Sequence, residues 1–263
     1  MQYKTTLTAY KKYLRSLKLR SSTLQNYIWH TEQFLSWLEE KSMTQTNLKT
    51  YYDFLLKKYP KIATINLHLV TVNKFLNFNK KRFRFDLLTL KEEPLAILTS
   101  TQLQKFLELP NKISSPVAIR DKALLELLYS TGLKIGQLVK LEKKYIDNIK
   151  QELIFNDHQI TIPPLAWAAV EKYLAQRQDD NPWLFINLDR ANKNIDKHLS
   201  VRSVERIISK YAQKLKPVLR INPQVLRNTL ASNLKQEGAQ IQGLKAALHF
   251  KTKVGAKNYW HKI

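Results

Sequence analysis

Apolar side chains recur at intervals of three and four residues along most of this chain, and that spacing restricts it to a largely helical fold. In the first 85 residues the pattern occurs four times, and each occurrence is short enough for a single helix. The four patterns run through Leu7 to Leu17, Leu24 to Leu38, Leu48 to Leu56 and Ile65 to Leu76. Residues 1–85 are therefore predicted to form a compact helical domain.

The rest of the chain keeps the helical spacing, with one short interruption. Residues 86–98 have no clean period and are predicted to be a linker, after which Thr99 and Gln102 have the form of a helix capping box. Further helices are predicted over 116–130, 134–141, 201–215, 223–237 and 240–249. Two β-prone runs, Glu152–Phe155 and Gln159–Ile162, are predicted to pair as a hairpin. The predicted fold class is mainly α (α+β), with a second, mixed α/β domain over 99–263.

The charge balance points to a polyanionic partner. The 44 Lys and Arg residues exceed the 21 Asp and Glu residues, which gives a net charge of +23. Residues 1–90 carry +11 of this excess and residues 91–263 carry +12, so both predicted domains are basic. A protein that holds nucleic acid between two domains needs this distribution, because each neutralised phosphate releases counterions. Charge alone leaves RNA open beside DNA and says nothing about chemistry.

Several classes of protein are made improbable by what the sequence lacks. It has no Cys, which removes disulfides, Cys-ligated zinc and thiol nucleophiles. No apolar run approaches the length of a membrane span, and the N-terminal residues form an amphipathic helical pattern without the apolar block of a signal peptide. We therefore expect a cytoplasmic protein that does not partner with a membrane.

Three segments resemble the tyrosine recombinase (phage integrase) family, in particular its bacterial Xer-type members. Arg120 to Leu141 (RDKALLELLYSTGLKIGQLVKL) is similar to the start of that family's catalytic domain. Asn222 to Ala239 (NPQVLRNTLASNLKQEGA) is similar to the region of its H-x-L-R-H motif, and the chain ends in KNYWHKI, where the family has its nucleophilic tyrosine. The order of these segments, together with the helical domain and linker before them, extends the resemblance over nearly the whole chain.

The resemblance implies a helical, SAM-like core-binding domain and a catalytic-like domain that together clamp double-stranded DNA. It implies a reaction without metal or cofactor and without a small-molecule substrate. In that reaction a tyrosine hydroxyl attacks a backbone phosphate, and the freed 5′-hydroxyl of a partner strand later attacks the 3′-phosphotyrosyl link. The basic cluster Lys80, Lys81, Arg82 and Arg84 is a candidate DNA-binding segment. Possible protein partners are a second copy of the chain or an active recombinase.

Two positions match the family's motifs and three others depart from them. Arg227 matches the second family arginine, and Tyr259 matches the nucleophile 32 residues later, although an aromatic core residue is the alternative interpretation of Tyr259. The first family arginine falls on Lys134, which keeps the positive charge but cannot make the two parallel hydrogen bonds that a guanidinium makes to a phosphate. The first histidine of H-x-L-R-H falls on Gln224, which cannot shuttle a proton, and the second falls on Asn228.

The remaining two catalytic positions are uncertain or missing. Without a gap, the late His/Trp position falls on Phe250, whereas a one-residue shift places His249 there. The family's catalytic lysine belongs to a hairpin, but the turn here reads Asn156-Asp157-His158-Gln159; Lys150 lies too early to replace it, and a turn histidine such as His158 is usually just solvated.

Losing one oxyanion donor typically lowers a rate by roughly 10²–10³, and losing a general acid by roughly 10²–10⁴. We therefore expect a duplex-DNA-binding member of a recombination or integration system whose own strand cleavage is weak or lost. One alternative is an active recombinase with a substituted site that uses Tyr259, Arg227, Lys134 and His249. The other is a DNA- or RNA-binding regulatory module without a role in recombination.

Overall fold

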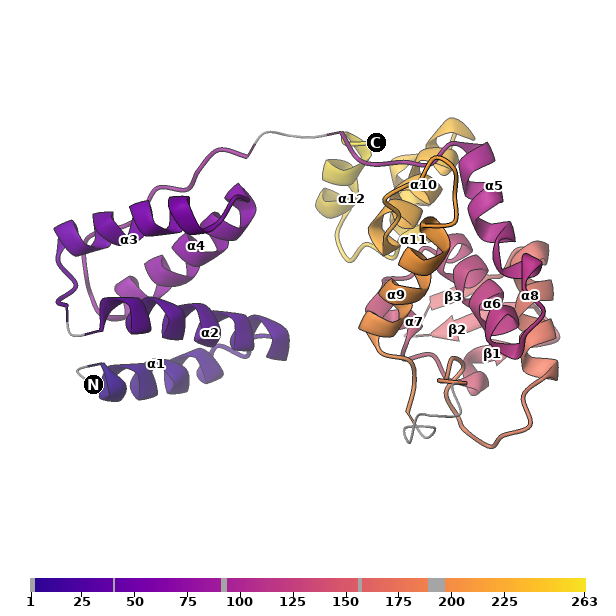
Figure 1. Cartoon of the computed structure of the whole chain (residues 1–263), viewed down its shortest axis with the longest axis horizontal. Helices are drawn as coiled ribbons and strands as arrows, with labels where there is room; N and C mark the ends of the chain where they lie inside the picture. The colour runs from indigo at the N-terminus through magenta and orange to yellow at the C-terminus, as the bar shows by residue number, and fades with distance from the viewer. Residues whose placement is uncertain (1–2, 40, 91–93, 156–157, 189–196) are drawn as a thin grey trace. The chain divides into compact units, whose positions relative to one another are not determined.

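The computed structural model describes residues 3–39, 41–90, 94–155, 158–188 and 197–263, and the chain divides into two compact units (Figure 1). The first unit is Met1–Glu93 and the second is Pro94–Ile263. Each has a hydrophobic core of its own. None of the helices within the described ranges is both long and apolar enough to cross a membrane.

The first unit is helical, as its apolar spacing predicts. Its helices are α1 (Lys4–Ser16), α2 (Ser21–Leu38), α3 (Gln45–Lys58) and α4 (Ile62–Phe78). The apolar positions that define the sequence pattern meet in one core, where Tyr10, Phe34, Tyr51 and Phe75 are almost completely buried. These rings pack edge to face, with centroids 5.0 Å apart for Tyr10 and Phe75 and 4.8 Å apart for Phe34 and Tyr51. Such aromatic pairs stabilise a core beyond the area they bury.

The chain that leaves α4 is held against that helix by two asparagines. Asn73 donates to the carbonyl of Phe85 and accepts its N–H, both at 2.8 Å. Asn66, two turns earlier on α4, makes the same pair of bonds with Leu88, at 2.8 and 2.9 Å. Residues 85–88 therefore lie along α4, although the lack of periodicity after residue 85 predicted that the linker begins there.

The second unit combines helices with one small sheet, which confirms the predicted mainly α (α+β) class. Its helices are α5 (Ser100–Glu108), α6 (Pro116–Ser130), α7 (Ile135–Leu138), α8 (Pro164–Ala175), α9 (Val201–Ala212), α10 (Pro223–Gln236), α11 (Ile241–Ala247) and α12 (Lys253–Trp260), with 3₁₀ turns at Pro110–Lys112 and Lys143–Tyr145. Helix α5 begins with the capping box predicted at Thr99 and Gln102. The helix predicted over 134–141 is shorter, because α7 ends at Leu138 and the chain then turns into the sheet.

The sheet has the order β1 (Ile146–Asp147), β2 (Glu152–Phe155) and β3 (His158–Thr161), and both pairings are antiparallel. In the β2–β3 register Leu153 faces Ile160. The predicted hairpin is therefore present, with an added edge strand that is too short to leave a period in the sequence. The turn residues Asn156 and Asp157 lie outside the described residues, as does the side chain of His158.

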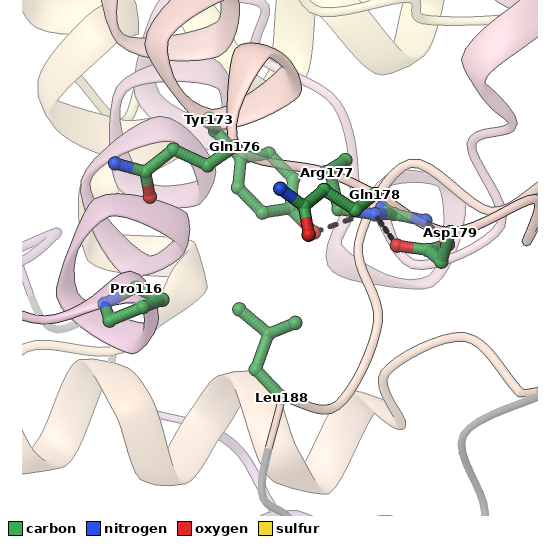
Figure 2. Close-up of a pocket in the computed structure, with 7 residues that line it drawn as sticks. All are labelled: Pro116, Tyr173, Gln176, Arg177, Gln178, Asp179 and Leu188. Atoms are coloured by element: carbon green, nitrogen blue, oxygen red, sulfur yellow. Dashed lines mark hydrogen bonds and ion pairs between the residues drawn. The ribbon is translucent and has the colours of Figure 1, made fainter.

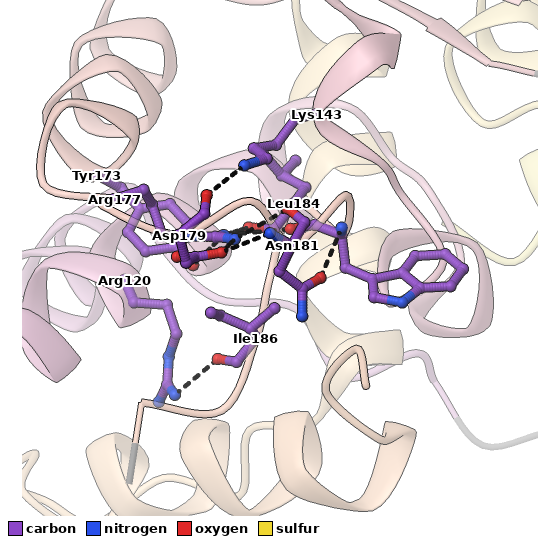
Figure 3. A network of polar contacts seen from close by, with 9 residues as sticks. Arg120, Lys143, Tyr173, Arg177, Asp179, Asn181, Leu184 and Ile186 are labelled. Carbon is purple, nitrogen blue, oxygen red and sulfur yellow. Dashed lines mark hydrogen bonds and ion pairs between the residues drawn. The ribbon is translucent and has the colours of Figure 1, made fainter. Parts of the chain in front are cut away.

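Helix α6 is the central element of the second core, and it packs against α8 and α10. Its N-terminal half contains a buried ion pair in which Asp121 accepts from Arg120 at 2.6 and 3.0 Å and from the Tyr211 hydroxyl at 3.0 Å. Arg120 also donates to the Ile186 carbonyl at 3.2 Å (Figure 3). The pair therefore ties α6 to α9 and to the segment that follows α8.

A second buried arginine, Arg177, fixes the same segment. It donates to the carbonyls of Trp183 and Leu184 at 3.1 and 2.9 Å and forms an ion pair with Asp179 (Figure 3). A hollow of about 260 Å³ lies beside this network, lined by Pro116, Tyr173, Gln176, Arg177, Gln178, Asp179 and Leu188 (Figure 2). Arg177 and Asp179 form an ion pair at the wall of this hollow.

Candidate functional site

The floor of the site is a tight turn at the end of α6. Gly132 has a φ of +59°, a conformation that strains any residue with a side chain. A Cβ at this position would lie 2.7 Å from the Ala247 carbonyl oxygen and 2.9 Å from the Leu248 Cδ2. The Thr131-Gly132 step of the sequence therefore lets the end of α11 approach α6 closely.

Arg227 on α10 occupies the space above this turn. Its side chain is buried, and its two terminal nitrogens donate to the carbonyls of Gly132 and Leu248. The guanidinium carbon lies 5.4 Å from the centre of the Phe250 ring, which is a cation–π distance. Burial lowers the pKa of Arg227, and the nearby Tyr259 acts in the opposite direction. A guanidinium has more N–H groups than these two carbonyls take up, so Arg227 is held rigidly and can still donate to an anion.

The Tyr259 hydroxyl, on α12, lies among side-chain amides of α10. It donates to Oδ1 of Asn228 and accepts from Nε2 of Gln224 at 3.2 Å. The same Gln224 nitrogen lies 2.8 Å from Asn228 Oδ1. Burial raises the pKa of Tyr259, whereas Arg227 and the Gln224 hydrogen bond lower it. Tyr259 is therefore a protonated phenol beside a buried cation. The phenol oxygen and the two amide atoms hydrogen-bonded to it, Asn228 Oδ1 and Gln224 Nε2, cannot act as bases near neutral pH.

Phe250 and His249 have different surroundings. The Phe250 ring lies over Arg227 and also packs on the Tyr259 ring, with centroids 5.3 Å apart. His249 has a φ of +52° and places Nε2 2.9 Å from the Thr131 carbonyl oxygen. Because a carbonyl can only accept, Nε2 carries the proton and donates it. The side chain that contacts both Arg227 and Tyr259 is thus Phe250, and His249 binds the turn after α6.

Lys134 lies two residues beyond the Gly132 turn, at the N-cap of α7, where its N–H donates to Gln137 Oε1 at 3.1 Å. Its side chain is exposed, in contrast to the buried Arg227. Lys134 therefore stands at the edge of the Arg227–Tyr259 group, with an ammonium that is accessible to a ligand from solvent.

The basic cluster at the end of α4 belongs to the first unit. Lys80 has a φ of +54° and Lys81 donates its N–H to the Leu76 carbonyl at 2.9 Å, a geometry that ends the helix. Lys80, Lys81, Arg82 and Arg84 are all exposed. Arg84, however, donates to Asn77 Oδ1 at 2.7 Å and to the carbonyls of Lys81 and Phe83. Its guanidinium therefore holds the turn together, whereas Lys80, Lys81 and Arg82 are exposed side chains that form no ion pair with another described residue.

Of the candidate catalytic residues, the structure places Tyr259, Arg227 and Gln224 together, and two further residues belong to the same group. Asn228 was identified in the sequence only as a departure from a motif, yet its Oδ1 accepts a hydrogen bond from the Tyr259 hydroxyl. The Gly132 carbonyl accepts a hydrogen bond from Arg227. In the sequence, Gly132 was indicated only by the Thr131-Gly132 pair that interrupts the helical pattern. Among the described residues, no cluster of three or more His, Asp or Glu side chains could hold a metal ion.

Comparisons with known proteins identify the family of this chain. Residues 96–263 match the sequence model of the phage integrase family. The chain is 27% identical over 264 residues to the tyrosine recombinase XerA of Pyrococcus furiosus, a match that covers 89% of this chain and 87% of XerA. It is 26% identical over 266 residues to the tyrosine recombinase XerC of Bacillus subtilis, covering 91% and 85% of the two chains.

The fold is also shared with solved structures. A crystal structure of XerA recombinase matches with a TM-score of 0.56 and 21% identity, covering 97% of this chain and 92% of that one. The Tn1549 transposon integrase in complex with transposon right end DNA matches with a TM-score of 0.76 and 16% identity, covering 97% and 94%. At these identities the likeness concerns the fold.

Proposed function

The chain belongs to the phage integrase family, and on that premise we propose that it binds duplex DNA in site-specific recombination or integration, with strand cleavage of its own that is weak or lost. The observation that supports this most directly is the Arg227–Tyr259 group, in which the nucleophile and one phosphate-binding arginine are kept while amides surround the hydroxyl. The Tn1549 integrase, which shares the fold, is bound to DNA in its structure.

The charge distribution supports the DNA partner independently of the site. The net charge of +23 is divided almost equally between residues 1–90 and 91–263. Lys80, Lys81 and Arg82 form an exposed basic turn in the first unit, and Lys134 is exposed in the second. Phosphate contacts of this kind are distributed over many side chains, so DNA binding survives the loss of individual catalytic groups. A cytoplasmic location and assembly with a second copy or with an active recombinase are part of the same proposal.

The retained residues have definite roles in this proposal. The Tyr259 hydroxyl is the nucleophile that would displace the 5′-oxygen of a backbone phosphate and form the 3′-phosphotyrosyl link. Arg227, held by two carbonyls, would donate to a non-bridging oxygen. Lys134 would supply charge without a bidentate fork. Gln224 has no ionisable proton to give to the leaving oxygen, and Phe250 presents only an aromatic ring, so the leaving group lacks an efficient acid.

DNA binding is tested by fluorescence anisotropy on a labelled duplex over a range of salt concentrations. We expect sub-micromolar binding at low salt and a steep decline with salt. The slope of the logarithm of the binding constant against the logarithm of the salt concentration measures how many phosphates are neutralised. Replacing Lys80, Lys81 and Arg82 by Gln should reduce the magnitude of this slope by about 0.9 for each phosphate that the variant no longer neutralises. Lys144→Gln is the matched control, because Lys144 already pairs with Glu142 at 2.8 Å. Affinity no stronger than micromolar at low salt, or a slope near zero, contradicts the proposal.

A second candidate function is an active recombinase with a substituted site, and the proximity of Tyr259 to Arg227 favours it. The two candidates are separated with a nicked duplex that traps the covalent protein–DNA adduct. Weak or absent adduct in the wild type, increased by Lys134→Arg together with Gln224→His, supports a decayed site. An adduct that forms rapidly in the wild type and disappears in Tyr259→Phe supports an active enzyme. If the adduct persists in Tyr259→Phe, the assignment of the nucleophile is wrong.

The third possibility, a DNA- or RNA-binding regulatory module, makes a different prediction. Such a module would bind one duplex without regard to Arg227 and Tyr259, and it would not bring two DNA sites together. Bridging of two labelled duplexes in a pull-down experiment would contradict the regulatory module. Preferential binding of a duplex RNA competitor would contradict the main proposal.

A further inference from the structure

We propose that Asn228 is a positioning residue for the Tyr259 hydroxyl, and that the chain entering the second unit fixes its orientation through the carbonyl of Ala96. The inference rests on the proposed function in one respect only, which is the identification of Tyr259 as the nucleophile. Asn228 itself does not match the family's histidine at this position, so the resemblance assigns it no role.

The contacts of Asn228 determine how its amide is turned. Asn228 is 3% exposed. Nδ2 donates to the Ala96 carbonyl at 3.1 Å, and Oδ1 accepts from Tyr259 and from Gln224 Nε2. If the amide were flipped, Oδ1 would face the Ala96 carbonyl and Nδ2 would face the Gln224 NH₂ group. Both encounters are repulsive, so the Ala96 carbonyl selects the rotamer that offers an acceptor to Tyr259.

The segment around Ala96 is itself fixed to α10. Leu98 donates its N–H to the Thr229 hydroxyl at 3.0 Å, and Thr229 is the residue after Asn228. Leu98 is buried in the core of the second unit. Asn228 and Thr229, which are adjacent on α10, therefore both hydrogen-bond to residues 96–98. Asn228 also accepts the hydrogen bond of the Tyr259 hydroxyl, so the position of this segment affects the orientation of that hydroxyl.

The consequence for Tyr259 is a defined direction of its O–H bond. Because the proton points to Asn228 Oδ1 and one lone pair accepts from Gln224, the remaining lone pair has a fixed direction beside Arg227. An oxygen that attacks phosphorus needs such alignment, and loss of alignment by about 1 Å lowers a rate by up to roughly 10²-fold. Asn228 thus positions the hydroxyl, and an amide cannot remove its proton.

A readout independent of DNA is the titration of the Tyr259 phenol. A hydrogen bond that accepts from the neutral phenol favours the protonated form, so Asn228→Ala should lower the pKa of Tyr259. Asn228→Asp keeps the acceptor and adds a negative charge, so it should raise that pKa. We expect shifts of about one unit in opposite directions. A residue that merely supports the fold would not produce shifts of opposite sign.

The experiment uses the full chain with 3-fluorotyrosine in place of tyrosine, because the fluorinated phenol is more acidic and titrates while the protein stays folded. The ¹⁹F resonance of position 259 is assigned by its absence in Tyr259→Phe. The matched control is Asn233→Ala, since Asn233 is also on α10 and its Nδ2 donates to another tyrosine hydroxyl, that of Tyr129, at 2.9 Å. The control should leave the Tyr259 titration unchanged.

Opposite shifts in the two Asn228 variants, with none in Asn233→Ala, confirm the inference. Equal shifts of one sign, or no shift, overturn it. On a wild type that forms adduct, Asn228→Ala should also slow adduct formation by at least tenfold at unchanged DNA affinity. Rapid adduct formation by the wild type would contradict the proposed weak cleavage and would leave the titration result untouched. A wild type that forms no adduct agrees with the proposed function, and the titration alone then decides the role of Asn228, so the two failures are distinguishable.

Discussion

Replacing Gly132 by alanine is expected to destabilise the second unit and to disturb Arg227 at the same time. The backbone at Gly132 has a φ of +59°, which strains an L-residue by roughly 1–2 kcal/mol. The added Cβ would lie 2.7 Å from the Ala247 carbonyl oxygen, 2.9 Å from the Leu248 Cδ2 and 3.0 Å from the Leu230 Cδ2. Overpacking of this kind adds about 1–3 kcal/mol. We expect a total loss of about 3 kcal/mol in the free energy of unfolding.

The assay is thermal unfolding followed by circular dichroism, with Gly136→Ala as the matched control. At roughly 2–4 °C per kcal/mol, Gly132→Ala should lower the Tm of the second unit by about 6–12 °C. Gly136 lies in α7 with nothing within 4 Å of an added Cβ, so its replacement should leave the Tm unchanged or raise it. If Gly132→Ala unfolds within about a degree of the wild type, the close approach of α11 to the Thr131-Gly132 turn is wrong, since either penalty alone would exceed that.

Three further predictions concern stability. The pKa of His68 is lowered to about 4, first by burial and then by His30 and Lys58, so below about pH 6.5 the unfolded chain binds a proton that the folded chain does not. The free energy of unfolding should therefore be full above pH 6.5 and fall by about 3 kcal/mol toward pH 4. Urea unfolding over this pH range measures the loss, and His68→Gln should remove it. Asp121→Asn should cost about 3–5 kcal/mol because it removes the partner of a buried arginine, and wild-type urea stability would refute this. Asn73→Ala removes both bonds to Phe85 and should cost about 1–3 kcal/mol, seen as faster amide exchange at Phe85.

The helices of this chain could be predicted because local signals determine them. The four patterns of the first unit depend on apolar spacing, and the start of α5 depends on Thr99 and Gln102, which are three residues apart. Elements governed by tertiary contacts could not be located in this way. Helix α7 ends at Leu138 although helical spacing continues beyond it, and residues 85–88 are held by asparagines of α4 that no periodicity reveals.

The part of the candidate site that could be predicted consists of residues that match a sequence motif. Arg227 and Tyr259 were predicted as candidates from motif and interval, and the structure places them close together. Whether His249 or Phe250 lies near them depends on the turn after α11, where His249 adopts a positive φ. The role of Asn228 depends on Ala96, which is 132 residues away in the sequence. Contacts between segments so distant in sequence leave no local pattern.

The most direct test of the proposed function is covalent trapping on a labelled, nicked duplex taken from the DNA that flanks the gene, with wild type, Tyr259→Phe and the double variant Lys134→Arg, Gln224→His. We predict binding of the duplex by all three proteins, little or no adduct in the wild type, none in Tyr259→Phe, and more in the double variant. Rapid and complete adduct formation by the wild type would contradict the proposal, because the substitutions at Lys134 and Gln224 would then not have weakened cleavage.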